Sequence, residues 1–195
     1  MKTRLTRTDL MPLERYHIER QAFRRRVIEH KAVRQVFLGA HVCLTFEDAL
    51  TIQYQIQEML RVERIFEADA IQEELDVYNA LMPDGDNWKA TMMIEYEDSE
   101  ERRVALERLV DIEGRVWIKL GVHPPIFAIA DEDLERSRDN KTSAVHFLRF
   151  QLTPASVAAA KAGSALGMGV DHPAYSHSVV AVSEATRRSL INELA

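Results

Sequence analysis

Cysteine is almost absent from the 195-residue chain, which has only Cys43. A single thiol excludes an intramolecular disulfide framework and a cysteine-rich zinc or iron–sulfur site within one chain. Glycine and proline are also scarce, with seven and six residues, which argues against a low-complexity or long flexible segment. The scarcity of cysteine indicates a reducing compartment.

Long hydrophobic runs are absent as well. No window approaches the roughly 18 consecutive apolar residues that a membrane-spanning helix needs. Residues 1–10 carry Lys2, Arg4 and Arg7 but no apolar central region, so they lack the pattern of a secretory signal. We therefore expect a cytoplasmic protein with no membrane association.

Charge is unevenly distributed along the chain, although the net charge is only −6. Residues 1–34 hold ten basic and four acidic residues, whereas residues 47–113 hold six basic and nineteen acidic residues. A basic N-terminal helix can bind nucleic acid, but no aromatic interleaving or known nucleic-acid module accompanies it. We expect the basic helix to lie near the acidic middle, in the same subunit or a partner, and we expect no nucleic-acid binding.

The hydrophobic pattern predicts an α+β fold in which a mostly antiparallel sheet is packed by several helices. A long N-terminal helix is expected over residues 12–34, with Tyr16, Phe23 and Val27 as its apolar stripe. Further helices are expected over residues 48–64, 67–82, 98–114, 154–163 and 183–194, and strands over residues 35–38, 42–47, 89–96, 115–120, 126–130 and 144–152. No linker or internal repeat interrupts the pattern, so residues 1–195 are expected to form a single domain.

The most distinctive local cluster is Asp171-His172-Pro173-Ala174-Tyr175, which is expected in a non-helical segment. An Asp–His pair can orient a general base, and loops of this kind often carry function. Asp171 equally suits a turn before the X-Pro step. The cluster makes Asp171, His172 and Tyr175 candidate catalytic residues, with a structural role as the alternative.

Two residues of a predicted strand, His146 and Arg149, complete the candidate site. His146 alternates with Leu148, Phe150 and Leu152 on an apolar strand face, where a histidine is usually hydrogen-bonded in the core. Arg149 lies on the opposite face and needs an acceptor, because burying an unpaired guanidinium is costly. That acceptor is either a structural glutamate or an anionic ligand.

No segment predicts a metal or cofactor site. His41-x-Cys43 offers only two ligands, and Glu14-x-x-His17 is expected to face solvent. Di-iron carboxylate sites need two Glu-x-x-His pairs and two further glutamates. The glycines at 163, 167 and 169 fit neither the P-loop nor the dinucleotide-binding pattern. We expect no metal and no cofactor.

A polar face on the second predicted helix is the candidate interaction surface. Its residues are Gln53, Gln57, Glu58, Arg61 and Arg64. The two glutamines carry no charge and suit an interface, and Glu58 can pair with Arg61 one turn away. The face is either an ordinary solvated side or a docking surface for a partner helix.

The string YQIQEMLRVERI from Tyr54 to Ile65, together with the N-terminal helix and GVDHPAY from Gly169 to Tyr175, resembles the bacterial family named domain of unknown function 3501. The resemblance covers the whole chain and implies a bacterial protein without an assigned activity. It also implies a redox or iron-related setting, because genes of this family often lie beside genes for a rubrerythrin-like protein and an iron–sulfur oxidoreductase. The resemblance supplies no catalytic residues.

The sequence supports two hypotheses for the function. The first is a non-enzymatic accessory protein that acts through protein–protein contact, as a homodimer or with another protein. The second is an enzyme or small-ligand-binding protein whose site gathers Asp171, His172, Tyr175, Arg149 and His146. A spatial test separates them: the second gains if these side chains line one enclosed pocket, and it loses if they are dispersed.

Overall fold

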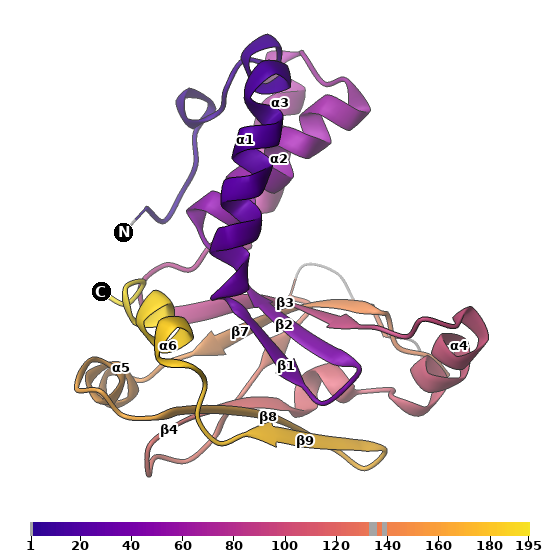
Figure 1. Ribbon diagram of the computed structural model, residues 1–195, viewed down its shortest axis with the longest axis vertical. Coiled ribbons are helices and arrows are strands. Elements are labelled where there is room, and N and C mark those ends of the chain that lie inside the picture. Colours follow the sequence, from indigo (N-terminus) through magenta and orange to yellow (C-terminus); the bar gives the residue numbers. More distant parts are fainter. Residues whose placement is uncertain (1, 133–135, 138–139) are drawn as a thin grey trace.

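The computed structural model describes residues 2–132, 136–137 and 140–195. Within these residues, an arm of three helices rises from a body that contains two sheets (Figure 1). The arm comprises α1 (Leu13–Ala32), α2 (Ala49–Glu63) and α3 (Ala68–Asn79), preceded by η1 (Arg7–Asp9). The body comprises β1 (Gln35–Leu38), β2 (Val42–Phe46), β3 (Asn87–Ile94), α4 (Ser99–Arg108), η2 (Ile112–Arg115), β4 (Val116–Leu120), β5 (Ile126–Phe127), β6 (Ile129–Ala130), β7 (Val145–Gln151), α5 (Pro154–Lys161), β8 (Leu166–His172), β9 (Tyr175–Val179) and α6 (Glu184–Ile191). The expectation of a single domain over residues 1–195 stays a prediction.

Both sheets are antiparallel, and they enclose the main hydrophobic core. The first sheet has the strand order β1-β2-β3-β7-β6, and the second has the order β5-β4-β8-β9. Trp88 and Phe150 of the first sheet pack in one cluster with Ile118 and Met168 of the second. The predicted α+β fold is therefore confirmed, with its strands divided between two facing sheets.

The strand register determines which side chains of the first sheet face away from this core. Lys89 of β3 lies between the buried Trp88 and Ala90, and it is directly opposite Arg149 of β7. Because side chains alternate between the two faces of a strand, Lys89 and Arg149 lie on the outer face. The arm rises on this side of the body, and the second sheet lies on the other side (Figure 1).

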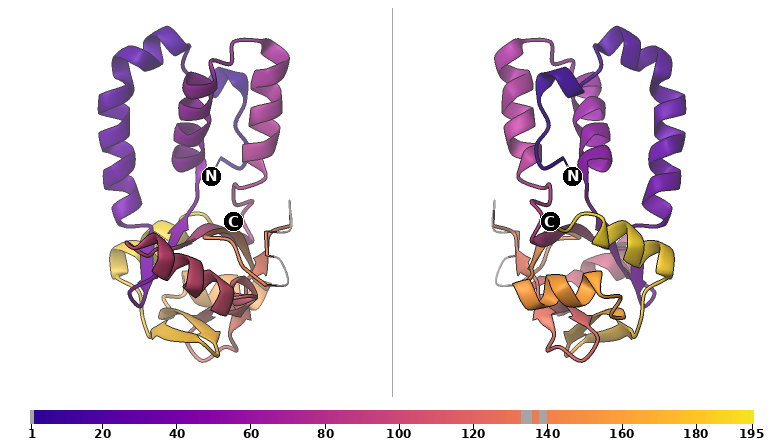
Figure 2. Two further views of the ribbon diagram at one scale, coloured as in Figure 1. Left: turned by 90° about the vertical axis from the view of Figure 1, so that its right-hand side faces the viewer. Right: turned by 90° about the vertical axis from the view of Figure 1, so that its left-hand side faces the viewer.

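The arm has two small cores of its own. Tyr16, Phe23 and Val27 of α1 are buried, which confirms the predicted stripe and the long N-terminal helix. Ile52 of α2 and Leu75 of α3 belong to the second cluster. Accordingly, α2 lies between α1 and α3 (Figure 2).

Three local predictions differ from the structure. The segment around Asp171 is not an isolated loop, because it belongs to the β8–β9 hairpin. The helix expected to end at Gly114 ends at Arg108 and is followed by η2. The strand expected over residues 126–130 is divided, because β5 pairs with β4 of the second sheet and β6 pairs with β7 of the first. For the hairpin and the divided strand, pairing with other strands overrides the local pattern, whereas α4 is separated from η2 by Asp111 in the left-handed conformation.

None of the helices in the described part of the chain is long and apolar enough to cross a membrane. The longest of these helices, α1, has 20 residues. Its sequence is interrupted by charged side chains such as Arg24, Arg25 and Arg26, which are exposed.

Candidate functional site

The Asp171–Tyr175 hairpin is held by structural hydrogen bonds. The Nδ1 atom of His172 accepts a hydrogen bond at 3.1 Å from the backbone N–H two residues further on, and its Nε2 atom lies 3.0 Å from the carbonyl oxygen of Val110. The hydroxyl of Tyr175 donates to the carbonyl of Leu38 at 2.6 Å. Asp171 is exposed. His172 and Tyr175 therefore fasten the hairpin to the rest of the body.

His146 and Arg149 lie on β7, in the other sheet. The side chain of His146 is fully buried, and its Nδ1 atom is 2.5 Å from the Oδ2 atom of Asp131. The guanidinium of Arg149 donates two hydrogen bonds of 2.7 Å to the carboxylate of Glu132, and these raise the pKa of Arg149. The acceptor of Arg149 is thus a glutamate. The five candidate catalytic residues are divided between two sheets and do not line one pocket.

One group of side chains has donor atoms suited to a metal ion. Ligand atoms of Glu113, Asp131 and His146 lie within 4.8 Å of one another. The same side chains also take part in hydrogen bonds, since the hydroxyl of Thr142 lies 2.9 Å from Nε2 of His146 and Ser137 donates to Glu113 at 2.5 Å. No spacing in the sequence indicates this group, because its members come from three separate segments. Either a cation or the hydrogen-bond network can hold them together.

The polar face predicted on α2 is covered by the N-terminal segment of the same chain. Gln57 is fully buried, its Oε1 atom accepts from the backbone N–H of Met11 at 2.6 Å, and its Nε2 atom donates to the Met11 carbonyl at 3.3 Å. Gln53 donates to the carbonyl of Asp9 at 2.5 Å. The interpretation of Gln57 as part of an exposed docking surface is therefore wrong. Both glutamines hold the N-terminal segment against the arm.

Glu58 connects α1 with α2. Its carboxylate accepts hydrogen bonds from the hydroxyl of Tyr16 at 2.6 Å and from Arg20 at 2.7 and 2.8 Å. The bonds from Arg20 lower the pKa of Glu58 to about 2. The basic N-terminal helix thus pairs with the acidic middle of the same chain. Arg61 also donates to Glu58, at 3.2 Å, and Arg64 is exposed.

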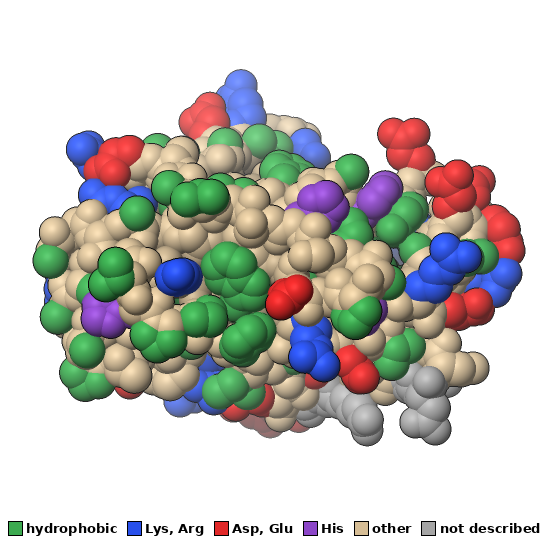
Figure 3. Space-filling model, turned by 90° about the horizontal axis from the view of Figure 1, so that it is seen from below, with side chains coloured by type: hydrophobic (Ala, Val, Ile, Leu, Met, Phe, Trp, Pro, Cys, Tyr) green, Lys and Arg blue, Asp and Glu red, His purple; other side chains and the backbone are tan. Residues whose placement is uncertain are grey.

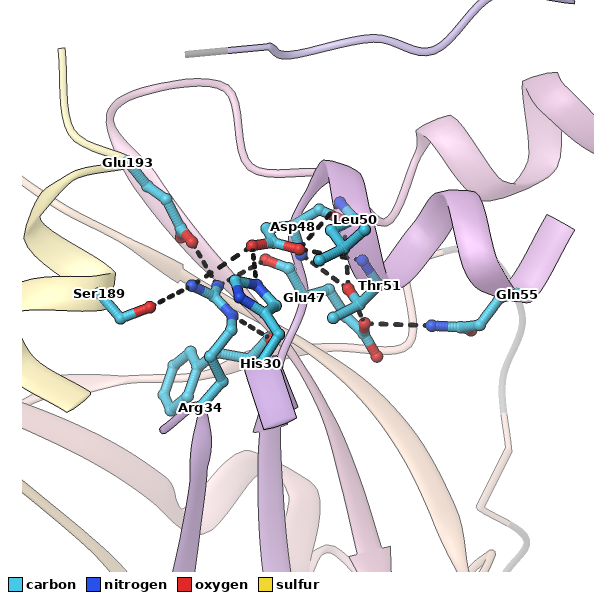
Figure 4. A network of polar contacts seen from close by, with 10 residues as sticks. His30, Arg34, Glu47, Asp48, Leu50, Thr51, Gln55, Ser189 and Glu193 are labelled. Carbon is cyan, nitrogen blue, oxygen red and sulfur yellow. Dashed lines mark hydrogen bonds and ion pairs between the residues drawn. The ribbon is translucent and has the colours of Figure 1, made fainter. Parts of the chain in front are cut away.

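A buried arginine, Arg34, joins the arm to the body at the end of α1 (Figure 4). Its side chain is 1% exposed. The guanidinium donates to the carbonyls of Phe46 at 2.9 Å and Glu47 at 3.1 Å, and to the hydroxyl of Ser189 at 2.9 Å. It also forms an ion pair with Glu193. One side chain therefore connects α1, the start of α2 and the C-terminal helix α6.

Two carboxylates with different pKa values face Arg34. The Oδ2 atom of Asp48 lies 3.6 Å from Arg34 and 2.5 Å from Nε2 of His30. Burial acts against the charge of Asp48, but the positive charge of Arg34 and a backbone hydrogen bond keep the pKa of Asp48 below its ordinary value. Burial raises the pKa of Glu193 to about 7. Asp48 is therefore the permanent counter-charge, and Glu193 ionises near neutral pH.

Glu47 is a buried carboxylate beside this network. It is 2% exposed, and it accepts hydrogen bonds from the hydroxyls of Thr51 and Thr91, both at 2.6 Å, and from the amide of Gln55 at 3.1 Å. These donors are neutral, and no described cation forms an ion pair with Glu47. Because a buried anion without a cationic partner is costly, a positive charge would be strongly stabilised beside it.

A cavity of about 430 Å³ lies beside Glu47, between the root of the arm and the outer face of the first sheet. We call this cavity the notch. Its walls come from the end of β2, from the connection between α3 and β3, and from strands β3 and β7. The lining residues are Glu47, Ala80, Leu81, Asp84, Asn87, Lys89, Ala90, Glu132, Phe147, Leu148, Arg149 and Gln151. Arg149 is the one candidate catalytic residue among them.

The two cations of the notch already have partners. The Nζ atom of Lys89 donates to the carbonyl of Ala80 at 2.6 Å, and burial lowers the pKa of Lys89. The guanidinium of Arg149 donates to the carboxylate of Glu132. The amide of Asn87 donates to Asp84 at 2.5 Å, whereas its Oδ1 atom has no hydrogen-bond partner among the described residues. The lining therefore carries three carboxylates, Glu47, Asp84 and Glu132, against two cations that already have acceptors.

Comparison with known proteins shows the family of this chain. Residues 4–194 match the family described as protein of unknown function (DUF3501). The chain belongs to this family. A solved structure of a novel protein of unknown function from Burkholderia pseudomallei is 50% identical, with 98% of this chain and 99% of that chain covered and a TM-score of 0.93. No curated protein matches the chain.

Membership of the DUF3501 family confirms the resemblance carried by residues 54–65 and 169–175. Neither the family description nor the solved structure supplies an activity. Sequence reasoning missed the notch of this family member, because its residues belong to elements that are distant in the chain. The one local signal was Glu47, an acid directly after the apolar strand Val42–Phe46.

Proposed function

We propose that this protein is a cytoplasmic, non-enzymatic accessory protein that binds a partner protein in the notch. The observation that carries the proposal is the buried carboxylate of Glu47, whose described partners are all neutral, beside a cavity of about 430 Å³. The partner group that fits is a lysine or arginine side chain, since hydrogen bonds between charged groups are stronger than those between neutral ones. The single buried thiol of Cys43 supports a reducing compartment.

The walls of the notch suit the shape of such a side chain. Leu81 and Phe147 supply apolar surface, on which the methylene groups of lysine or arginine can pack while the charged end reaches a carboxylate. Asp84 is exposed at the same cavity and offers a second negative charge. The volume is within the range of small-ligand sites, so one inserted side chain fits.

An anionic partner group fits the notch less well. Lys89 already donates to a backbone carbonyl, and Arg149 already donates to a carboxylate. Burial also lowers the pKa of Lys89, which makes its positive charge easier to lose. An incoming anion would therefore compete with existing bonds and would leave Glu47 unpaired.

The resemblance to the family also predicts a link to rubrerythrin-like and iron–sulfur proteins. That link stays a prediction. If one of these proteins is the partner, the proposal requires it to present a lysine or an arginine to the notch.

The test uses N-acetyl-L-arginine methylamide, a compound that presents an arginine side chain without charged termini. Titration into the full chain, followed by backbone amide chemical shifts, should perturb signals of residues 80–90 and 147–151. A dissociation constant of the order of 1 mM, or about 4 kcal/mol of binding free energy, is expected for one side chain. N-acetyl-L-glutamate methylamide is the acidic counterpart and should not bind there.

Two variants connect the binding to the carboxylates. Asp84→Asn should weaken binding by up to about fivefold, because an exposed ion pair contributes up to about 1 kcal/mol. Glu47→Gln should weaken it by at least about tenfold, because Glu47 is the buried charge. Asp69→Asn is the matched control on the exposed side of α3 and should have no effect. Binding of the acidic compound in the notch, or equal binding of the basic compound by all variants, would show that the proposal is wrong.

A further inference from the structure

The outer face of the second sheet has an apolar centre that no described helix covers (Figure 1, Figure 3). No helix of the described chain lies below β4 and β8 (Figure 1), and hydrophobic side chains gather in the middle of this face when it is seen from below (Figure 3). Among the residues around it, Phe127 is 47% exposed, Val180 is 90% exposed and Val122 is 98% exposed. Because contiguous exposed apolar patches on soluble proteins often mark interaction sites, this face indicates an interface.

Two glycines of β8 shape this face. Gly169 lies opposite Trp117 of β4, and a Cβ atom at Gly169 would come within 2.4 Å of the Trp117 ring. A Cβ atom at Gly167 would come within 2.7 Å of the carbonyl oxygen of Val180. The Trp117 ring therefore lies against the sheet, with Phe127 of β5 beside it in the register. The result is a broad aromatic surface that another flat surface can cover.

Two opposite charges lie at the ends of this aromatic surface. Lys119 of β4 is two residues from Trp117 and lies opposite Gly167 of β8. Asp171 of β8 is two residues from Gly169, toward the opposite end of the pair of strands. With a rise of about 3.3 Å per residue, the two charged positions are roughly 13 Å apart. Both side chains are exposed, and neither forms an ion pair within the described chain.

We propose that two copies of this chain form a dimer by packing these faces together, with Lys119 of one copy against Asp171 of the other. A two-fold axis in the interface exchanges the copies, so the dimer contains this ion pair twice. Trp117 and Phe127 then lie near the centre, where aromatic residues contribute most to binding.

A second copy is the occupant that the charges favour. Lys119 and Asp171 are exposed side chains of opposite charge, so a copy of the same face satisfies both at once. A partner surface of a single charge would leave one of them opposed by a like charge, which is unfavourable. The strands β3 and β7 that line the notch lie toward the arm, away from this face (Figure 1), so dimerisation leaves the notch open. The dimer therefore goes beyond the proposed function and does not depend on it.

Sedimentation velocity of the full chain, from about 1 to about 100 µM, tests the dimer. The wild type should reach twice the 22.4 kDa of one chain. Lys119→Asp and Asp171→Lys each place like charges opposite one another, and each should weaken the dimer at least about tenfold. The variant that carries both substitutions restores opposite charges and should return to within about threefold of the wild-type dissociation constant.

Two further variants separate the interface from general effects. Arg25→Asp makes the same change of charge at an exposed position of α1 and should leave the dimer unchanged. Phe127→Ser removes exposed apolar surface and should abolish the dimer while circular dichroism shows a folded chain. A wild type that stays monomeric at about 100 µM would overturn the proposal. A dimer that neither single charge variant weakens, or that the double variant does not restore, would overturn it equally.

Discussion

Replacing Glu193 by glutamine should remove a pH-dependent part of the stability of this protein. Glu193 follows α6, is 6% exposed, and contacts the buried Arg34 at the root of the arm (Figure 4). Burial raises the pKa of its carboxyl group from 4.5 to about 7. Glutamine keeps the shape and the accepting oxygen of the neutral acid, but it cannot ionise.

The magnitude follows from the difference between the folded and unfolded pKa values of Glu193. Between pH 4.5 and 7, the folded chain keeps this proton and the unfolded chain has lost it. The stability of the wild type therefore falls as the pH rises through this range, and above it the contribution of this group is constant. A difference of about 2.5 pKa units corresponds to about 3 kcal/mol. At about pH 8, the Glu193→Gln variant should be more stable than the wild type by up to about 3 kcal/mol, and the difference should shrink toward about pH 5.

Urea unfolding at a series of pH values between about 5 and 8 measures this difference. The indole Nε1 of the buried Trp88 donates to the carbonyl of Leu190 at 2.9 Å, so tryptophan fluorescence reports on the packing of the C-terminal helix. Glu29→Gln, at an exposed position of α1, is the matched control and should unfold with the pH dependence of the wild type. If Glu193→Gln is less stable than the wild type at about pH 8, the ion pair with Arg34 outweighs burial and the reasoning is refuted.

Two further predictions concern the arm core and the candidate metal ligands. Phe23→Ala should destabilise the protein by about 3–5 kcal/mol, because Phe23 is 8% exposed and packs against other aromatic rings. Arg24→Ala, next to it but exposed, should stay within about 0.5 kcal/mol of the wild type, and equal losses in denaturant titrations would mean that the helical face is assigned wrongly. Elemental analysis of the purified protein should find no stoichiometric iron or zinc, because hydrogen bonds engage Glu113, Asp131 and His146. About one metal ion per chain, lost in His146→Ala, would contradict this.

The elements that could be predicted are those with signals inside their own segment. Asp48 was expected to open the second helix, and its side chain accepts hydrogen bonds from the backbone N–H groups of Leu50 and Thr51. Thr153 caps α5 in the same way, ahead of Pro154 at the first helical position. Helix capping is a contact between residues that are close in sequence, and the spacing of apolar residues is a local pattern. Both can therefore be recognised without knowledge of the fold.

The candidate site could not be predicted in the same way, because its contacts join distant segments. The uncharged Gln57 was interpreted as an interface residue, yet it binds Met11 of the same chain. Arg149 was expected to find an acceptor, and only the course of the chain after β6 shows that Glu132 supplies it. The sequence can indicate that a polar side chain needs a hydrogen-bond or ion-pair partner. The neighbouring residues do not identify that partner.

The sequence by itself determined the kind of protein: an α+β chain with a long basic N-terminal helix and one thiol, recognisable as a member of its family. Composition, periodicity and capping suffice for this, since each acts over a few residues. The tertiary structure alone decided that the strands divide into two sheets, that Glu47 lies buried beside the notch, and that Lys119 and Asp171 share one uncovered face. Burial and electrostatic surroundings depend on which distant elements pack together, so these features exist only once the chain is folded.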